Sequence, residues 1–127
     1  MHEILHSPRL PKPRFHYTPV IKMGPWVRFS GMIALDAVTG SVEAGGAGAE
    51  AAKILANLKA ALPDLDLRLD QLVSARIYTT RFDLFAAINS AWEAALQELS
   101  VPPTRTSVGV AALPLGASVE MEFEFYK

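Results

Sequence analysis

Cysteine is absent from the 127 residues of this sequence, which excludes disulfide bonds and thiolate nucleophiles. Histidine is scarce, and all three histidines, His2, His6 and His16, lie close to the N-terminus. The spacing of His2 and His6 would suit a metal pair on a helix, but without further ligands it is more typical of polar residues at a chain end. No serine has a histidine placed by a motif to act as its base, so a serine-hydrolase triad is not expected.

An excess of charge of either sign is also absent. Twelve Lys and Arg residues against thirteen Asp and Glu residues give a formal net charge of -1, with no long run of like charge. Binding to phosphates needs concentrated positive charge, so a nucleic-acid partner is not expected. No apolar window is long enough to cross a bilayer, and the N-terminus lacks the apolar core of a signal peptide. We therefore expect a soluble, cytoplasmic protein that does not contact membranes.

The composition is that of a folded chain, because 50% of the residues are hydrophobic and 20% are charged. One domain over residues 1–127 is large enough to bury a core. Prolines at positions 8, 11 and 13 predict an extended N-terminal arm over residues 1–14. The glycine-rich segment 43–48 lacks the lysine of a P-loop and the third glycine of a dinucleotide fingerprint, and it predicts the start of a helix.

Hydrophobic periodicity predicts the regular elements. In chain order they are strands at 20–23 and 26–33, a helix at 49–62, a strand at 73–80, a helix with an apolar face from 85 to 99, and strands at 105–112 and 118–125. Thr80 and Asp83 have the spacing of a capping box that would begin the second helix. Two short helices cover only one face of a sheet, so the pattern predicts an α+β layer with a mixed sheet.

The last two runs flank a Pro/Gly turn at 114–116, and we expect them to pair as a hairpin. In the favoured register Gly109 lies opposite Glu120 and Arg105 opposite Glu124, because a slip of one residue would mix the apolar and polar faces. This hairpin predicts a guanidinium and a row of carboxylates on one face, over a glycine and serine floor with room for a small ligand. The alternative is a sheet with one solvated face, on which the charges are simply hydrated.

Three stretches of the sequence resemble the RidA family of reactive intermediate deaminases, also called YjgF-like proteins. RTSVGVAALPLGASVEME, residues 105–122, resembles the family's C-terminal signature. The segment from Tyr17 to Asp36 is similar to its N-terminal block, with the pattern Y-x-P-V-I-K followed by V-x-F-S-G-x-I-x-L-D. SARIYTTRFDLFAAIN, residues 74–89, is similar to a third block and ends on a commonly retained asparagine.

The resemblance implies a chorismate-mutase-like fold, in which a single-layer, mixed six-stranded sheet carries two helices on one face. It also implies a homotrimer with clefts between the subunits. The pattern of residues is consistent with such a partner, because Trp26 and Met32 are expected on the same face as Arg28 and Glu120. A face that mixes large apolar and charged side chains is expected to be partly buried against another subunit.

The resemblance further implies hydrolytic deamination of reactive 2-imino acids or enamines, of the kind that pyridoxal-phosphate dehydratases release from serine or threonine. The products would be a 2-keto acid and ammonia, and neither a cofactor nor a metal would be needed. Arg105 would hold the substrate carboxylate with its two-pronged guanidinium, and Glu120 would orient or activate the attacking water. The residues implied as substrate-binding are Tyr17, Ser30, Gly31, Met32, Asn89 and Ser107.

Several positions depart from the family pattern, among them Ala95 and Leu96, where an aromatic pair is frequent. Met32 stands where glutamine is common, which predicts a more apolar pocket, and Trp92 stands where tyrosine is usual, for which core packing is expected. These departures keep a second function open, that of a non-catalytic or regulatory protein that binds carboxylate metabolites. A third, a ribonuclease or translation inhibitor, is disfavoured by the balanced charge. The side chain of the substrate stays open at this point.

Overall fold

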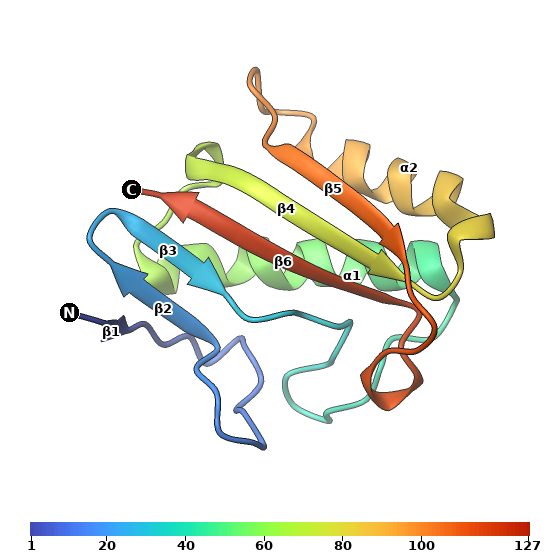
Figure 1. Ribbon diagram of the computed structural model, residues 1–127, viewed down its shortest axis with the longest axis horizontal. Coiled ribbons are helices and arrows are strands. Elements are labelled where there is room, and N and C mark those ends of the chain that lie inside the picture. The colour runs from blue at the N-terminus through green and yellow to red at the C-terminus, as the bar shows by residue number, and fades with distance from the viewer.

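The computed structural model describes residues 1–127, and six strands form one mixed sheet with two helices on one face (Figure 1). The order of the strands in the sheet is β1-β2-β3-β6-β4-β5. The elements are β1 (Glu3–Ile4), β2 (Val20–Met23), β3 (Trp26–Phe29), α1 (Ala47–Ala61), β4 (Leu72–Thr79), α2 (Phe85–Leu96), β5 (Thr104–Gly109) and β6 (Val119–Tyr126). This architecture confirms the predicted α+β fold. Neither helix is long and apolar enough to cross a membrane.

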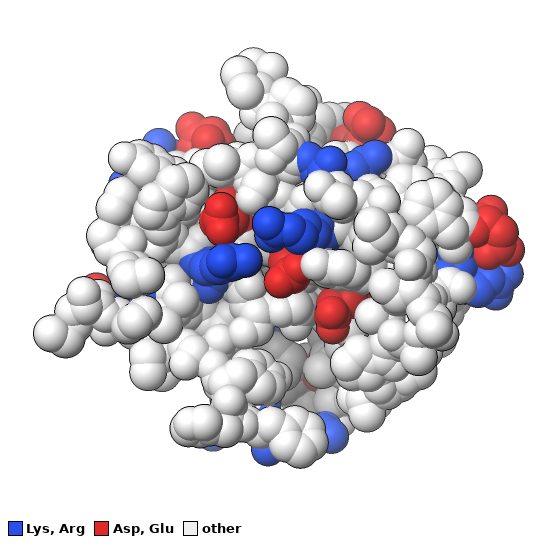
Figure 2. Space-filling model, in the orientation of Figure 1, with Lys and Arg blue, Asp and Glu red and all other residues white.

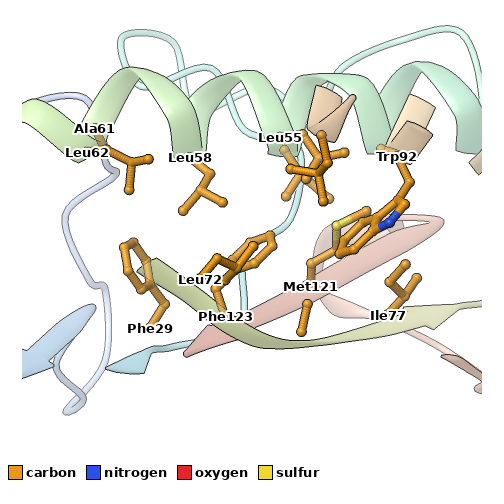
Figure 3. Packing of buried hydrophobic residues seen from close by; sticks show 14 of the residues in the cluster. Phe29, Leu55, Leu58, Ala61, Leu62, Leu72, Ile77, Trp92, Met121 and Phe123 are labelled. Atoms are coloured by element: carbon orange, nitrogen blue, oxygen red, sulfur yellow. The ribbon is translucent and has the colours of Figure 1, made fainter. Parts of the chain in front are cut away.

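The core lies between the sheet and the helices (Figure 3). Strand β6 supplies the centre of the sheet, because its apolar alternation places four side chains toward the helices: Val119, Met121, Phe123 and Phe125, each at most 1% exposed. Helix α1 faces them with Ile54, Leu55 and Leu58, which are almost completely buried. The spacing of these three residues gives α1 one apolar stripe, as its sequence predicts.

The start of α2 differs from the predicted capping box. Helix α2 begins at Phe85, after a 3-10 turn at Phe82–Leu84, and no side chain caps it. The carboxylate of Asp83 instead accepts two hydrogen bonds from the guanidinium of Arg81, at 2.9 and 3.0 Å. The local ion pair thus replaces the reciprocal hydrogen bonds that a capping box with Thr80 would need.

The predicted hairpin of the last two strands is wrong, because β4 lies between β5 and β6. Strand β4 pairs parallel with β5 and antiparallel with β6. The burial of the two strands gives the reason: the apolar face of β6 needs neighbours on both sides, whereas β5 is largely exposed and suits an edge. Helix α2 supplies the crossover that a parallel β4–β5 pair requires.

This order changes the faces on which the predicted site residues lie. Arg105 pairs with Ala75, which is buried under the helices, so Arg105 lies on the helix-covered face. Glu120 pairs with Tyr78 and lies on the open face. The expectation that Arg105 and the carboxylates share one face is therefore wrong. Alternation fixes the faces within each strand, but the strand order decides how the faces of two strands match.

The open face carries charges of both signs, gathered over the middle of the sheet (Figure 2). Arg28 forms an ion pair with Glu124 at 3.5 Å, and the hydroxyl of Tyr78 donates a hydrogen bond to Glu122. At one end of this face the rings of Trp26 and Tyr126 meet edge to face, with centroids 5.0 Å apart. Trp26 and Tyr126 are 44% and 52% exposed, so this face mixes large apolar and charged side chains, as predicted for Trp26. The prediction for Met32 is wrong, because Met32 pairs with Met121 and packs against the core on the helix-covered side.

Candidate functional site

Glu120 lies near the start of β6, packed against the backbone of Gly31. A Cβ atom at residue 31 would lie 2.8 Å from Cδ of Glu120, so only glycine leaves room for this carboxyl group. Burial raises the pKa of the Glu120 carboxyl, and the charge of the neighbouring Glu122 raises it further. The site therefore holds a partly desolvated carboxyl group that packs on Gly31, which is a suitable arrangement for proton transfer.

A cavity of about 1260 Å³ opens beside this carboxyl group. The predicted site residues in its wall are Tyr17, Ser30, Gly31, Met32 and Glu120. Most of the remaining wall comes from the N-terminal segment, from the chain that follows β3, and from the turn at 114–115, and Phe29 of β3 and Asn57 of α1 complete it. Five of the eight predicted site residues are thus brought together in one chain.

The N-terminal segment is held to the sheet by a few hydrogen bonds around Ser30. The hydroxyl of Ser30 donates to the carbonyl oxygen of Thr18 at 2.6 Å, and its amide donates to the carbonyl oxygen of Pro19 at 2.8 Å. Farther out, the hydroxyl of Ser7 donates to the carboxylate of Asp64 at 2.7 Å. In this arrangement the proton of the Ser30 hydroxyl is used to hold the cavity wall.

Arg105, Asn89 and Ser107 form a second group on the helix-covered side of β5. The guanidinium Nη1 of Arg105 donates a hydrogen bond to Oδ1 of Asn89 at 2.7 Å. Its Cζ atom lies 5.3 Å from the ring centroid of Trp92 and 5.5 Å from that of Phe85. Such distances allow cation–π attraction, so the aromatic rings and the amide fix the direction of the guanidinium.

Arg105 is nevertheless exposed and forms no ion pair with a carboxylate. A planar guanidinium that is held in place, with N–H groups still free, is suited to bind a carboxylate ligand through two parallel hydrogen bonds. Ser107 lies two residues farther along the same face of β5 and is half-buried. These three residues do not line the cavity beside Glu120.

Phe85 and Trp92 are functional candidates that the sequence analysis missed in this role. Trp92 is buried in the core, as expected, and it also supports the guanidinium of Arg105. The available signal was helical spacing, because Phe85, Asn89 and Trp92 are four and three residues apart and so lie on one face of a helix.

Glu50 is a second residue that the sequence analysis missed. It is 5% exposed, and its carboxylate accepts hydrogen bonds from the amides of Ser118 and Val119 at 2.8 and 3.3 Å. The hydroxyl of Thr79 donates to the carbonyl oxygen of Ser118 at 2.8 Å. Glu50 therefore anchors the chain directly before Glu120. The sequence does carry a signal for this role. Glu50 lies three positions after Ala47 and four before Ile54, so it is an acidic residue within the apolar stripe of α1 and is expected to face the core.

Similarity to known proteins covers nearly the whole chain. The family model described as Endoribonuclease L-PSP matches residues 8–124. A curated relative, the 2-iminobutanoate/2-iminopropanoate deaminase of Dermatophagoides farinae, is 32% identical over 119 residues, which cover 94% of this chain and 91% of that protein. Two of the similar solved structures are RidA from an Antarctic Psychrobacter species and E. coli TdcF with bound serine.

The Psychrobacter protein is 30% identical, with a TM-score of 0.90 over 98% of this chain and 99% of that one. The E. coli protein is 27% identical, with a TM-score of 0.91 over 98% of each chain. These similarities confirm the resemblance in the three sequence blocks. From the family match and the shared fold together, the chain belongs to the RidA, or YjgF-like, family.

Proposed function

We propose that this protein is a hydrolytic deaminase of reactive 2-imino acids and their enamines, releasing 2-keto acids and ammonia. The observation that carries the proposal is Glu120, a carboxyl group of raised pKa that faces a large cavity. A neighbouring imine carbon is already electrophilic, so its hydrolysis needs a positioned water and a group that moves protons. A named deaminase among the relatives of this chain supports the same chemistry.

In the proposed reaction, water adds to C2 of the imino acid while the Glu120 carboxylate accepts one of its protons. Glu120 returns this proton to the nitrogen. Glu120 then accepts the proton of the new hydroxyl group and passes it to the amino nitrogen, so that the C2–N bond breaks, the carbonyl forms, one water is consumed and one ammonia is released. Arg105 binds the substrate carboxylate and fixes the distance between C2 and the water.

We further propose that the working site lies between copies of the chain in a homotrimer. Arg105 and Glu120 lie on opposite faces of one sheet, so a small ligand bound to both must take them from different copies. Arg105 belongs to an exposed edge strand, and the open face exposes Trp26 and Tyr126, both of which a second copy would cover. The cavity beside Glu120 of one copy would then receive Arg105, Asn89 and Ser107 of the next.

A mixing experiment tests both parts of the proposal. A dehydratase that acts on threonine generates the imine, and hydrolysis is followed as loss of semicarbazone trapping. Neither Arg105→Ala nor Glu120→Ala alone should accelerate hydrolysis. Equal amounts of the two variants, dissociated and reassembled together, should regain about a quarter of the parent activity, because a quarter of the interfaces then combine two intact halves.

No activity from the parent protein on any imine would refute the deaminase. An active parent whose variants fail to complement after verified mixing would refute the shared site. A stable monomer in sedimentation at micromolar concentration would refute the trimer. In the last two cases the deaminase could still stand.

A non-catalytic carboxylate-binding protein is the second candidate. Met32, in place of the common glutamine, makes one part of the cavity wall apolar and favours this reading. Such a protein would be stabilised by 2-keto or amino acids in thermal unfolding without accelerating imine hydrolysis. The same assay, run beside a melting curve, separates the two functions.

A further inference from the structure

The cavity beside Glu120 is much larger than the short imino acids require. An imino acid of propanoate or butanoate size fills roughly 200 Å³, taking about 30 Å³ for each non-hydrogen atom, the share of a water in the liquid. The cavity measures about 1260 Å³, which exceeds even the range of about 300–1,000 Å³ typical for drug-sized ligands. The side chains of Arg105, Asn89 and Ser107 from the next copy would take roughly 400 Å³ more on the same basis, so a short substrate would still leave about half of this space to water.

Part of the cavity wall near Glu120 is apolar, beside the polar Ser30. Met32 follows Gly31, on which the Glu120 carboxyl group packs. The backbone of Met32 is tied to that of Met121 by two hydrogen bonds of 2.7 and 2.9 Å, so residue 32 is fixed next to the strand that carries Glu120. Leu35 lines the same cavity and is only half-buried. Apolar contacts are therefore available within one cavity with the reacting group.

Part of the outer wall of the cavity is apolar as well, among polar residues of the N-terminal segment and of the chain that follows β3. Phe15, Tyr17 and Leu115 all line it, and they are 82%, 51% and 60% exposed. These three large side chains remain in contact with water in the single chain. Their apolar surface is removed from water only when a ligand or another copy fills or covers the cavity. Lys12 and Arg14 also contribute to the wall, but both are exposed on the N-terminal segment, where water can solvate them.

From the size of the cavity and its apolar wall we infer that the substrates are 2-imino acids with a large apolar side chain, branched aliphatic or aromatic. The inference rests on the proposed function and specifies its substrate class. The imine carbon lies at Glu120, the carboxylate is bound by Arg105 of another copy, and the side chain extends along Met32 and Leu35 toward Leu115. Burial of this side chain, at about 0.8 kcal/mol for each methylene group, supplies the preference over smaller substrates.

The test compares imines of different size under one assay. D-amino-acid oxidase with catalase converts D-alanine, D-leucine and D-phenylalanine into their imines, which carry no stereocentre at C2. Hydrolysis by the full-length protein is measured from the loss of semicarbazone trapping. The imines from leucine and phenylalanine should have kcat/KM at least about tenfold above that from alanine, the scale of apolar pocket discrimination.

Two variants connect this preference to the cavity. Leu115→Asn replaces an apolar wall residue in a left-handed conformation, φ 56°, that asparagine tolerates. It should lower kcat/KM about tenfold for the large imines and leave the alanine imine nearly unchanged. Met32→Gln should shift the preference in the same direction. Val101→Asn is the matched control, because Val101 is 79% exposed and lies outside the cavity wall.

Equal or better hydrolysis of the alanine imine would overturn the inference while the deaminase itself stands. A size preference that Leu115→Asn and Met32→Gln leave unchanged would also overturn it, because the preference would then arise elsewhere. Failure to hydrolyse any of the three imines would overturn both the inference and the proposed function.

Discussion

Glu120 is placed on one face of the sheet through the anchored backbone of its own strand, whereas the guanidinium of Arg105 is held on the other face by neighbouring side chains. The carboxyl group of Glu120 packs on a glycine, and Glu50 anchors the amides of the two residues before it. Arg105 lies on an exposed edge strand, supported by two aromatic rings and one amide. The first arrangement fixes a group whose protonation state matters, and the second keeps a permanently charged group exposed for a ligand.

The largest expected effect comes from the Glu120 side. Glu120→Gln keeps the shape of the side chain and removes its ability to accept a proton. General acid–base catalysis contributes about 10²–10⁴-fold, so kcat for imine hydrolysis should fall by that factor while KM changes little. Steady-state kinetics on the threonine-derived imine measures both. If KM instead rose by the same factor while kcat stayed unchanged, Glu120 would be a substrate-binding residue, as Arg105 is proposed to be.

The next largest effect concerns the guanidinium. Arg105→Lys keeps the charge but loses the planar fork, and each hydrogen bond to a charged group contributes about 1.5–3 kcal/mol. We expect kcat/KM to fall about ten- to a hundredfold, with the midpoint of thermal unfolding nearly unchanged. A silent variant would identify Arg105 as a solvated edge charge, for which about 0–1 kcal/mol is typical.

Variants of Glu50 test whether the position of Glu120 depends on the hydrogen bonds from the amides of Ser118 and Val119 to the Glu50 carboxylate. Glu50→Ala leaves two amides at the start of β6 without an acceptor and should lower the free energy of unfolding by about 1–3 kcal/mol. Glu50→Gln keeps an acceptor oxygen and should retain most of the stability. Urea unfolding measures both variants. A kcat that recovers in Glu50→Gln along with stability supports a positioning role, whereas equal losses in both variants would contradict it.

The aromatic support of Arg105 should matter less. Phe85→Leu keeps an apolar side chain on α2 but removes one ring under the guanidinium. Cation–π attraction at an exposed site contributes about 0.5–1 kcal/mol, so KM should rise about two- to fivefold with kcat maintained. Ala86→Ser, at an exposed neighbouring position of α2, is the control. An unchanged KM in Phe85→Leu would show that Asn89 suffices to orient Arg105.

The smallest effect is a pH dependence of stability. A raised folded-state pKa means that the native protein binds the Glu120 proton more tightly than the unfolded chain does. The resulting stabilisation is complete below the unfolded value of about 4.3 and is lost as the pH rises through the folded value. The parent should therefore gain stability relative to Glu120→Gln as the pH falls from neutral. The opposite slope, measured by urea unfolding across this range, would contradict the raised pKa.

Much of the fold follows from the sequence because the information is local. The alternation of Val119, Met121, Phe123 and Phe125 predicts β6, and the stripe of Ile54, Leu55 and Leu58 predicts α1. The pairing of strands is not local. Residues 110–118 run past the end of β4, where the amide of Val110 donates to the carbonyl oxygen of Thr79, and no pattern within the segment distinguishes this path from a tight hairpin.

The candidate site shows the same division. The residues around Glu120 and those around Arg105 lie in the three sequence blocks that resemble the family, so they could be predicted. Their placement on opposite faces of the sheet depends on the strand order, which could not. The roles of Glu50 and Phe85 could not be predicted from the sequence, because their partners are distant along the chain. Glu50 accepts hydrogen bonds from residues 118 and 119, and the ring of Phe85 lies under the guanidinium of Arg105. Contacts of this kind are properties of the packed structure.

The N-terminal segment gives the cavity a largely exposed wall that touches the core through Leu5 and Leu10. Between Leu5 and Pro19 it is held mainly by the bonds to Ser30, Val20 and Asp64, and it contributes no strand there. Substitutions at its exposed positions can therefore reshape the cavity while the buried face of the sheet keeps its packing. If the protein is the proposed deaminase, its substrate range can change during evolution through this segment while the rest of the fold is conserved.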